Sequence, residues 1–266
     1  MISIIKPTDL KKLIKSIAKK IAVLAFWILV WELASRLISR NNDLLLLILP
    51  SPFTVFKTWT EIAFTHEFFM AVLSTFANVI FGFVLGIVLG FLLGVFTHYI
   101  KILDALISPM MRIVRAVPVV AFIILMYLFF ESNILPIVIV CLMVMPLMWQ
   151  TVHDALGHTN TELCEMAHVY KLSKPKIFLN IKLPSAMPQI LTNTVNSLGL
   201  AWKSGVAAEV ICLPNVSLGT ILWQSKGTVD FDEVYAVTLT VVILSILLEI
   251  LIKYLSKKVV ERTQYA

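Results

Sequence analysis

The feature that most constrains this chain is a long run without charge. Ala71–Thr97 contains no Asp, Glu, Lys or Arg. A helix of that length crosses the hydrocarbon core of a bilayer, which is roughly 30 Å thick. Composition agrees, because 59% of the 266 residues are hydrophobic and only 14% are charged. A soluble domain carries about 25% charged residues, so a water-soluble globule is excluded, and the hydrophobicity excludes a disordered chain.

Further apolar stretches predict an all-α, polytopic membrane protein with six transmembrane helices. Residues 1–20 are expected to form a basic amphipathic helix in the membrane interface, followed by a transmembrane domain over 21–266. The first span is expected to be retained, since no convincing cleavage site follows it. A long polar loop is expected at 153–184. The predicted spans are about 21–39, 71–97, 109–130, 132–152, 185–212 and 234–254.

Four glycines recur every four residues within the charge-free run: Gly82, Gly86, Gly90 and Gly94. A helix turns by about 100° per residue, so a step of four drifts by only about 40°. The glycines therefore form one smooth stripe where another helix can approach closely. The stripe predicts helix packing and does not indicate a pore.

The basic residues predict which side of the membrane each loop faces. Six spans place both termini on one side, together with the 153–184 loop. Of the 22 Lys and Arg residues, 17 fall on that side, four fall on the other, and Lys203 lies within a span. The positive-inside rule therefore predicts cytoplasmic termini and a cytoplasmic loop, and the net charge of +6 needs no nucleic-acid partner. The basic residues on the opposite side are Arg36, Arg40, Lys57 and Lys226.

The polar loop at 153–184 reads as two short helices separated near Ser173-Lys174-Pro175. The loop is too long for a simple turn and too polar for a domain. From the residues alone, a docking element for a soluble partner and a solvated connector remain equally open.

Within this loop, Glu165-Met166-Ala167, Lys171 and Ile181-Lys182-Leu183-Pro184 resemble the cytoplasmic signature of bacterial ABC importer permeases. That family's pattern is Glu-Ala-Ala, three residues, Gly, about nine residues, then Ile-x-Leu-Pro, and the spacing here agrees with it. Met166 replaces the first Ala. Lys171 replaces the Gly that usually ends the first short helix in a left-handed turn, so either Lys171 adopts that conformation or the turn differs.

Other stretches are similar to the branch of the family that transports nitrate, sulfonate and taurine. The resemblance covers roughly residues 49–255. It rests on the order and spacing of several motifs together, and no single motif is decisive. The matching stretches are Leu49-Pro50-Ser51-Pro52, Pro109, Arg115-Ala116-Val117-Pro118, Ala201-Trp202, Glu209 and Ser217-Leu218-Gly219.

The resemblance implies a permease subunit in a bacterial inner membrane, acting as a homodimer with a second permease copy. It also implies two cytoplasmic ABC ATPase subunits and an extracytoplasmic substrate-binding protein. The segment around Glu165–Ser173 would be the coupling helix, moving as a rigid body with the ATPase. The residues expected to couple to the ATPase are Glu165, Met166, Ala167, Lys171, Leu172, Ser173, Leu183 and Pro184.

The chain carries no recognisable nucleotide, metal or catalytic motif. It lacks G-x-x-x-x-G-K-[ST], so ATP hydrolysis is expected in a separate subunit and the chain itself is expected to be neither an enzyme nor a cofactor protein. The histidines are scattered, and we expect no metal site. Cys141, Cys164 and Cys212 suggest neither a disulfide framework nor a metal site.

Lys203 and Glu209 are charges within a span that have no obvious partner four residues away. Ionisable residues inside the membrane are functional hypotheses by default. Six residues correspond to about 120° around a helix, so the two side chains point in different directions. Lys203 could attract an anion in the translocation path, or anchor the span. For Glu209, a role in a gate or subunit interface is favoured over substrate contact.

Two other function classes compete with an ATP-driven importer. A secondary transporter or channel would work without an ATPase and would be favoured by inverted repeats, of which the sequence gives no convincing sign. A membrane-embedded enzyme would need clustered titratable residues at one depth. The resemblance suggests a small anion such as a sulfonate or nitrate as substrate, with vitamin precursors as an alternative that the sequence leaves open.

Overall fold

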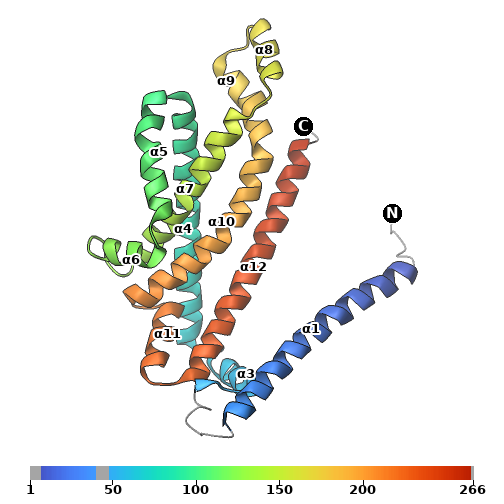
Figure 1. Cartoon of the computed structure of the whole chain (residues 1–266), viewed down its shortest axis with the longest axis vertical. Coiled ribbons are helices and arrows are strands. Elements are labelled where there is room, and N and C mark those ends of the chain that lie inside the picture. Colours follow the sequence, from blue (N-terminus) through green and yellow to red (C-terminus); the bar gives the residue numbers. More distant parts are fainter. Residues whose placement is uncertain (1–6, 40–47, 265–266) are drawn as a thin grey trace. The chain divides into compact units, whose positions relative to one another are not determined.

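The computed structural model describes residues 7–39 and 48–264, and the regular structure in these ranges is helical (Figure 1). These residues fall into two compact units. Unit 1 takes the described parts of Met1–Phe64 together with Ser225–Val237. Unit 2 takes Thr65–Gln224 and the described part of Thr238–Ala266. Each unit is described by itself.

Unit 1 is built around α1, Pro7–Ser39, which is one continuous helix where the sequence suggested an amphipathic helix followed by a span. Two polar side chains of α1 form hydrogen bonds with the backbone segment that precedes α3, Pro52–Ile62. Trp31 Nε1 donates to the carbonyl of Pro50 at 3.0 Å, and Ser35 Oγ donates to the carbonyl of Leu49 at 2.8 Å. The side chains of residues 7–17 and all of residues 1–6 lie outside the described part, so the amphipathic face stays a prediction.

The core of unit 2 is a packed trio of helices. These are α4, His66–Tyr99, α7, Leu135–Gly157, and α10, Leu183–Cys212. Buried apolar side chains from all three helices meet in one cluster, which includes Val79, Val140 and Trp202. Such a cluster removes apolar area that each helix could not cover alone. The trio therefore positions every candidate site residue on α10.

The glycine stripe is the seam between α4 and α7. A Cβ atom built on Gly90 would lie 2.5 Å from the carbonyl oxygen of Met145 and 2.8 Å from Met148 Cβ. The other three glycines of the stripe likewise face backbone carbonyls of α7. A backbone carbonyl cannot move aside as the tip of a side chain can. The helices α4 and α7 therefore pack this closely only because the facing residues of α4 have no Cβ.

The third expected span, residues 109–130, is not one helix. The structure has α5, Lys101–Ala116, and α6, Val119–Tyr127, which meet at an angle of 106°. Val117 is extended, with φ −73° and ψ 131°. A residue before proline is driven out of the helical region, so Val117-Pro118 breaks the span. Pro109 inside α5 does not break it, because membrane-protein helices tolerate one missing backbone hydrogen bond.

The 213–233 segment, expected to be a loop, contains a helix, α11, Leu218–Gly227. Ser217 caps its start, since Ser217 Oγ accepts a hydrogen bond from the backbone N–H of Thr220 at 3.0 Å. Serine is among the preferred residues at such a position. The last helix is α12, Phe231–Gln264, whose first turns belong to unit 1.

Four helices among the described residues are long and apolar enough to cross a membrane, or five if the bent pair α5–α6 counts as one span. These four contain Ala18–Ile38, His66–Tyr99, Leu135–Gly157 and Phe231–Tyr254. The fifth predicted span coincides with α10, which has the length to cross but a more polar sequence. The chain is thus an all-α, multi-pass membrane protein, and six spans remain a prediction.

Candidate functional site

Glu209 is fully buried near the end of α10, with none of its surface exposed. Its carboxylate accepts hydrogen bonds from Thr75 Oγ1 at 2.8 Å and from Asn78 Nδ2 at 3.5 Å, both on α4. It also accepts one from the backbone N–H of Gly219 at 3.4 Å, at the start of α11. A buried carboxylate is tolerated when donors surround it. Glu209 therefore connects three helices.

Thr75 links the Glu209 carboxylate to the backbone of α11 through two hydrogen bonds. Thr75 Oγ1, which donates to Glu209, accepts a hydrogen bond from the backbone N–H of Leu218 at 2.9 Å. Gly219 lies so close to Glu209 that an added Cβ would meet the Cβ of that residue. In the described residues no Lys, Arg or His forms an ion pair with Glu209. Hydrogen bonds from uncharged donors to the Glu209 carboxylate therefore connect α10 with α4 and α11.

Lys203 faces the other way and is exposed. Within the part of the chain that the structure describes, its ammonium group has no carboxylate within ion-pair distance. If α10 crosses the membrane as expected, a cation on it is costly in lipid, and such residues usually face a bundle interior or a water-filled cavity. The structure thus separates the two charges of α10, with Glu209 inside unit 2 and Lys203 on its surface.

Lys203 is the last member of a polar stripe along α10. Beyond Pro188, every exposed position of this helix is polar or glycine. The steps between these positions alternate between three and four residues, which places them on one face of the helix. We name this face the α10 stripe, and it consists of Gln189, Thr192, Asn196, Gly199 and Lys203.

The exposed face of α4 has the opposite character. Its most exposed side chains in the same membrane-spanning region are apolar, including Phe81, Val84, Val88 and Leu92. An apolar face is what lipid tails require, whereas polar side chains facing lipid are costly. The α4 face is therefore suited to lipid, and the α10 stripe is suited to water or to another protein surface.

Two cavities open beside the α10 stripe, and Asn196 lines both. The first, of about 290 Å³, is lined mainly by polar residues and lies between α10, α7 and the end of α5. There Asn193 Nδ2 donates to Thr151 Oγ1 at 2.7 Å, and Arg115 Nη1 donates to Gln150 Oε1 at 3.3 Å. Polar side chains thus extend from the α10 stripe across this cavity to Arg115, which lies near the end of α5.

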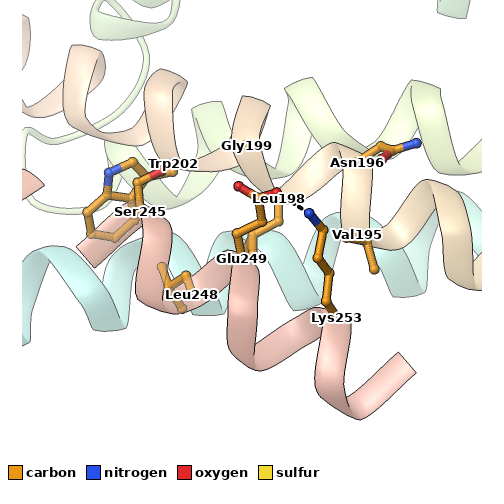
Figure 2. A pocket seen from close by; sticks show the side chains of 9 residues that line it. All are labelled: Val195, Asn196, Leu198, Gly199, Trp202, Ser245, Leu248, Glu249 and Lys253. Atoms are coloured by element: carbon orange, nitrogen blue, oxygen red, sulfur yellow. Dashed lines mark hydrogen bonds and ion pairs between the residues drawn. The ribbon is translucent and has the colours of Figure 1, made fainter. Parts of the chain in front are cut away.

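The second cavity, of about 230 Å³, lies between α10 and α12 (Figure 2). On the α12 side it is bordered by an ion pair, with Lys253 Nζ 2.5 Å from Glu249 Oε1. On the α10 side it is bordered by Asn196 and Gly199 of the stripe and by Trp202. The polar surface of α10 is therefore flanked by charged groups on the neighbouring helix.

The loop after α7 contains α8, Thr161–Val169, whose start is capped by Asn160 Oδ1 accepting from the backbone N–H of Glu162 at 2.8 Å. Glu165 is exposed and Met166 is 56% exposed, whereas Ala167 is buried. The exposed apolar side chains of this segment lie outside the candidate spans. They are Leu163, Met166, Val169 and Tyr170.

Lys171 has the left-handed conformation that the motif assigns to glycine, with φ 53°. The backbone N–H of Leu172 bonds the carbonyl of Ala167 at 3.0 Å, and that of Lys171 bonds the carbonyl of His168 at 2.9 Å. This pair of bonds is the Schellman arrangement that ends a helix. Of the two possibilities open at Lys171, the residue adopts the usual turn without glycine.

After this turn the chain is helical without a break from Lys174 to Cys212. It passes from α9, Lys174–Ile177, through the π-helical segment Phe178–Lys182 into α10. The Leu183-Pro184 pair of the motif forms the first turn of α10, where proline is well tolerated. The Ile181–Pro184 part of the motif and the α10 stripe therefore lie on one continuous helical path, which begins directly after the turn that ends α8.

The structure divides the residues singled out from the sequence into three places. The residues of the Glu165–Ser173 segment lie in α8 and the turn after it, Glu209 lies inside unit 2, and Lys203 lies on its surface. Thr75 and Asn78 were missed, because their long-range contact with Glu209 leaves no local pattern. The α10 stripe was also missed, although the three-and-four spacing of its polar residues is a readable signal.

Comparison with known proteins identifies a matching family model and several relatives. A family model described as "Binding-protein-dependent transport system inner membrane component" matches residues 82–261. A relative from Methanocaldococcus jannaschii, named as an ABC transporter permease protein, is 23% identical over 92% of this chain and 91% of its own. A relative from Bacillus subtilis, named for aliphatic sulfonates transport, is 22% identical over 80% of this chain and 78% of its own.

Comparison with solved structures also finds ABC transporters. A bacterial alginate ABC transporter, solved in complex with an alginate-bound periplasmic protein, matches with a TM-score of 0.62 and 14% identity over 91% of this chain and 96% of that chain. Other relatives carry names for nitrate import and for the transport of bicarbonate or riboflavin. The substrates named among the relatives therefore differ in chemistry.

Proposed function

Because the chain belongs to the family of binding-protein-dependent transport system inner membrane components, we propose that it is the membrane-spanning permease subunit of an ATP-driven importer for a small anion. It works with cytoplasmic ABC ATPase subunits, an extracytoplasmic binding protein and a second copy of itself. Its termini and the 153–184 loop face the cytoplasm, as the distribution of Lys and Arg indicates. ATP hydrolysis resides in the partner subunit.

The observation that carries this proposal is the exposed apolar face of α8. Leu163, Met166 and Tyr170 follow one another at three- and four-residue steps and all are exposed. The segment lies between two spans and is too short to be one, so lipid does not cover it. Exposed apolar residues rimmed by charge favour a protein partner. The ATPase is the partner that the motif around Glu165 implies.

The connection from α8 to α10 supports coupling between that partner and the path. Ala167 is buried and its carbonyl holds the backbone of Leu172, so α8 and its turn form a fixed unit. From Lys174 onward the helical backbone continues into α10 without interruption. A displacement of α8 by the ATPase is thereby transmitted to the helix that bears the α10 stripe, as a rigid-body movement.

The α10 stripe supports the anion and the second permease copy. Its polar face is unsuited to lipid, so the membrane-inserted protein must cover it or fill the space beside it with water. Two copies that face each other across their stripes enclose such a path. Lys203 supplies each wall with one positive charge that no carboxylate neutralises in the described residues, and this favours an anionic substrate.

The other function classes receive no comparable support. The family and the relatives are transport permeases, which disfavours a membrane-embedded enzyme. A secondary transporter or channel leaves the apolar face of α8 without an explanation. Lys203 supports an anionic substrate within this proposal, whereas one relative carries a riboflavin name.

Copurification with the ATPase tests the docking face. Glu165→Lys and Met166→Asp place charge on the exposed side of α8, and we expect each to reduce recovery of the ATPase by about tenfold, as loss of an interface contact of about 1.4 kcal/mol does. Glu61→Lys makes the same charge change on α3, where the side chain is also exposed, and should leave recovery unchanged. Equal recovery with all three variants would refute docking on α8.

A further inference from the structure

A cleft of about 460 Å³ lies beside the end of α4, against the loop segment that follows α8. Tyr99, which lines it, is the last residue of α4 and of a candidate membrane span. The cleft reaches back along α4 to Val95, about one helical turn earlier. Its position is therefore the depth where a span leaves the hydrocarbon core and meets the lipid phosphates.

The lining of the cleft has two distinct parts. The apolar part includes an aliphatic side chain of α4 and the buried Ile177, and the other part is basic. No Asp or Glu is among the described residues that line it. The apolar and aromatic lining residues are Val95, Tyr99, Pro175, Ile177 and Phe178, and the basic ones are His168, Lys174 and Lys182.

One of the lysines is held in place. Lys182 Nζ lies 3.3 Å from His98 Nε2 and 5.2 Å above the centre of the Tyr99 ring. Within the described residues neither Lys182 nor Lys174 has a carboxylate at ion-pair distance. Two ammonium groups thus border one cleft without a compensating negative charge, and an anion there would gain favourable electrostatic energy.

We propose that this cleft binds an anionic phospholipid, with its phosphate between Lys174 and Lys182 and the start of an acyl chain against Val95 and Phe178. Free phosphate would match the two ammonium groups but not the apolar part of the cleft. An acidic protein partner would reach the exposed Lys174, but not Val95 within the span. Basic pockets beside transmembrane helices are where anionic headgroups bind.

The site would connect lipid composition to the segment that precedes α10. Lys174 and Ile177 belong to α9, and Lys182 belongs to the π-helical segment that continues into α10. A bound headgroup therefore bridges the end of α4 and the first part of the helical path that leads to the α10 stripe. The inference requires only a membrane-spanning chain and does not depend on the substrate proposed above.

Native mass spectrometry of the full chain tests the proposal. Detergent-solubilised protein is equilibrated with equal amounts of phosphatidylglycerol and phosphatidylcholine, and the ratio of the two lipids that remain bound is measured. We expect enrichment of phosphatidylglycerol, a loss of about fivefold in Lys174→Gln, and a loss of about 25-fold when Lys182→Gln is added. Lys176→Gln removes a neighbouring exposed lysine that does not line the cleft and should change nothing.

Each other outcome argues against the site. No enrichment in the wild type, or the same loss in Lys176→Gln as in Lys174→Gln, would mean that only general surface charge acts. Displacement of phosphatidylglycerol by excess inorganic phosphate would identify a site for a free anion instead. Loss of bound lipid on addition of the partner ATPase would assign the two lysines to a protein interface. Lys174→Gln keeps the proposal testable if the double variant fails to fold, since Lys174 is exposed.

Discussion

Thr75 Oγ1 on α4 lies 2.8 Å from Glu209 Oε2 on α10 and donates a hydrogen bond to it. The same hydroxyl oxygen accepts from the backbone N–H of Leu218. One buried hydroxyl group thereby satisfies a carboxylate on one side and a helix start on the other. Because none of the Thr75 surface is exposed, water cannot replace either bond.

Replacing this hydroxyl should therefore destabilise the protein. Thr75→Val keeps the shape but leaves the Leu218 N–H without an acceptor and removes a donor to Glu209, at a cost of about 1–3 kcal/mol. We expect the melting temperature of the purified protein to fall by about 3–10 °C. Thr75→Ser keeps the hydroxyl and should stay much closer to the wild type. Equal melting temperatures for the valine and serine variants would contradict the role of this bond.

Gly90→Ala tests the seam between α4 and α7. The new Cβ would lie 2.5 Å from the carbonyl oxygen of Met145, so the two helices must separate. Overpacking of this kind costs about 1–3 kcal/mol, and we expect a lower melting temperature and a lower yield of monodisperse protein. Gly157→Ala is the matched control, since nothing lies within 4 Å of a Cβ there. A Gly90→Ala protein as stable as the control would show that the seam is loose.

Lys171→Gly should stabilise the turn that ends α8. The left-handed conformation costs a residue with a Cβ about 1 kcal/mol, and glycine avoids this cost. Hydrogen exchange of the Leu172 amide, which bonds the carbonyl of Ala167, should slow by about fivefold in the glycine variant and accelerate in Lys171→Val. An unchanged exchange rate in both variants would mean that the turn is not set by this residue.

Lys203→Met tests the positive charge on the α10 stripe. We expect ATP-driven uptake of nitrate or of a short alkanesulfonate, whichever the wild type transports, to fall by about tenfold or more, while ATPase docking is retained. Lys203→Arg keeps the charge and should keep most of the uptake. Lys226→Met removes an exposed lysine of α11 and serves as the control. Full uptake by Lys203→Met would remove the argument for an anionic substrate.

The helices could be predicted where one local rule dominates. The charge-free run gives α4 and the four-residue glycine spacing marks one of its faces, because both are properties of a single helix. The break at Val117-Pro118 was readable in principle, since a residue before proline avoids the helical region. The expected third span ran through it because its apolar composition outweighed that local signal.

The candidate site was predictable only in part, for a physical reason. Sequence patterns report neighbours along the chain, and the residues of the Glu165–Ser173 segment are such neighbours. Thr75 and Glu209 are separated by 134 residues, so their hydrogen bond depends on how α4 and α10 pack. The role of Lys203 likewise depends on the packing of α10. A lysine within an apolar stretch gives the same sequence pattern whether its side chain faces lipid, protein or water.

ATP-driven uptake by the assembled transporter is the most direct test of the account. The chain would be reconstituted in liposomes with its ATPase, with the binding protein outside and ATP inside, and uptake of the anion measured for the wild type and Glu165→Lys. We predict uptake that requires ATP, the ATPase and the binding protein together, and that is lost in Glu165→Lys. Uptake by the permease alone, or full uptake by Glu165→Lys, would contradict the account.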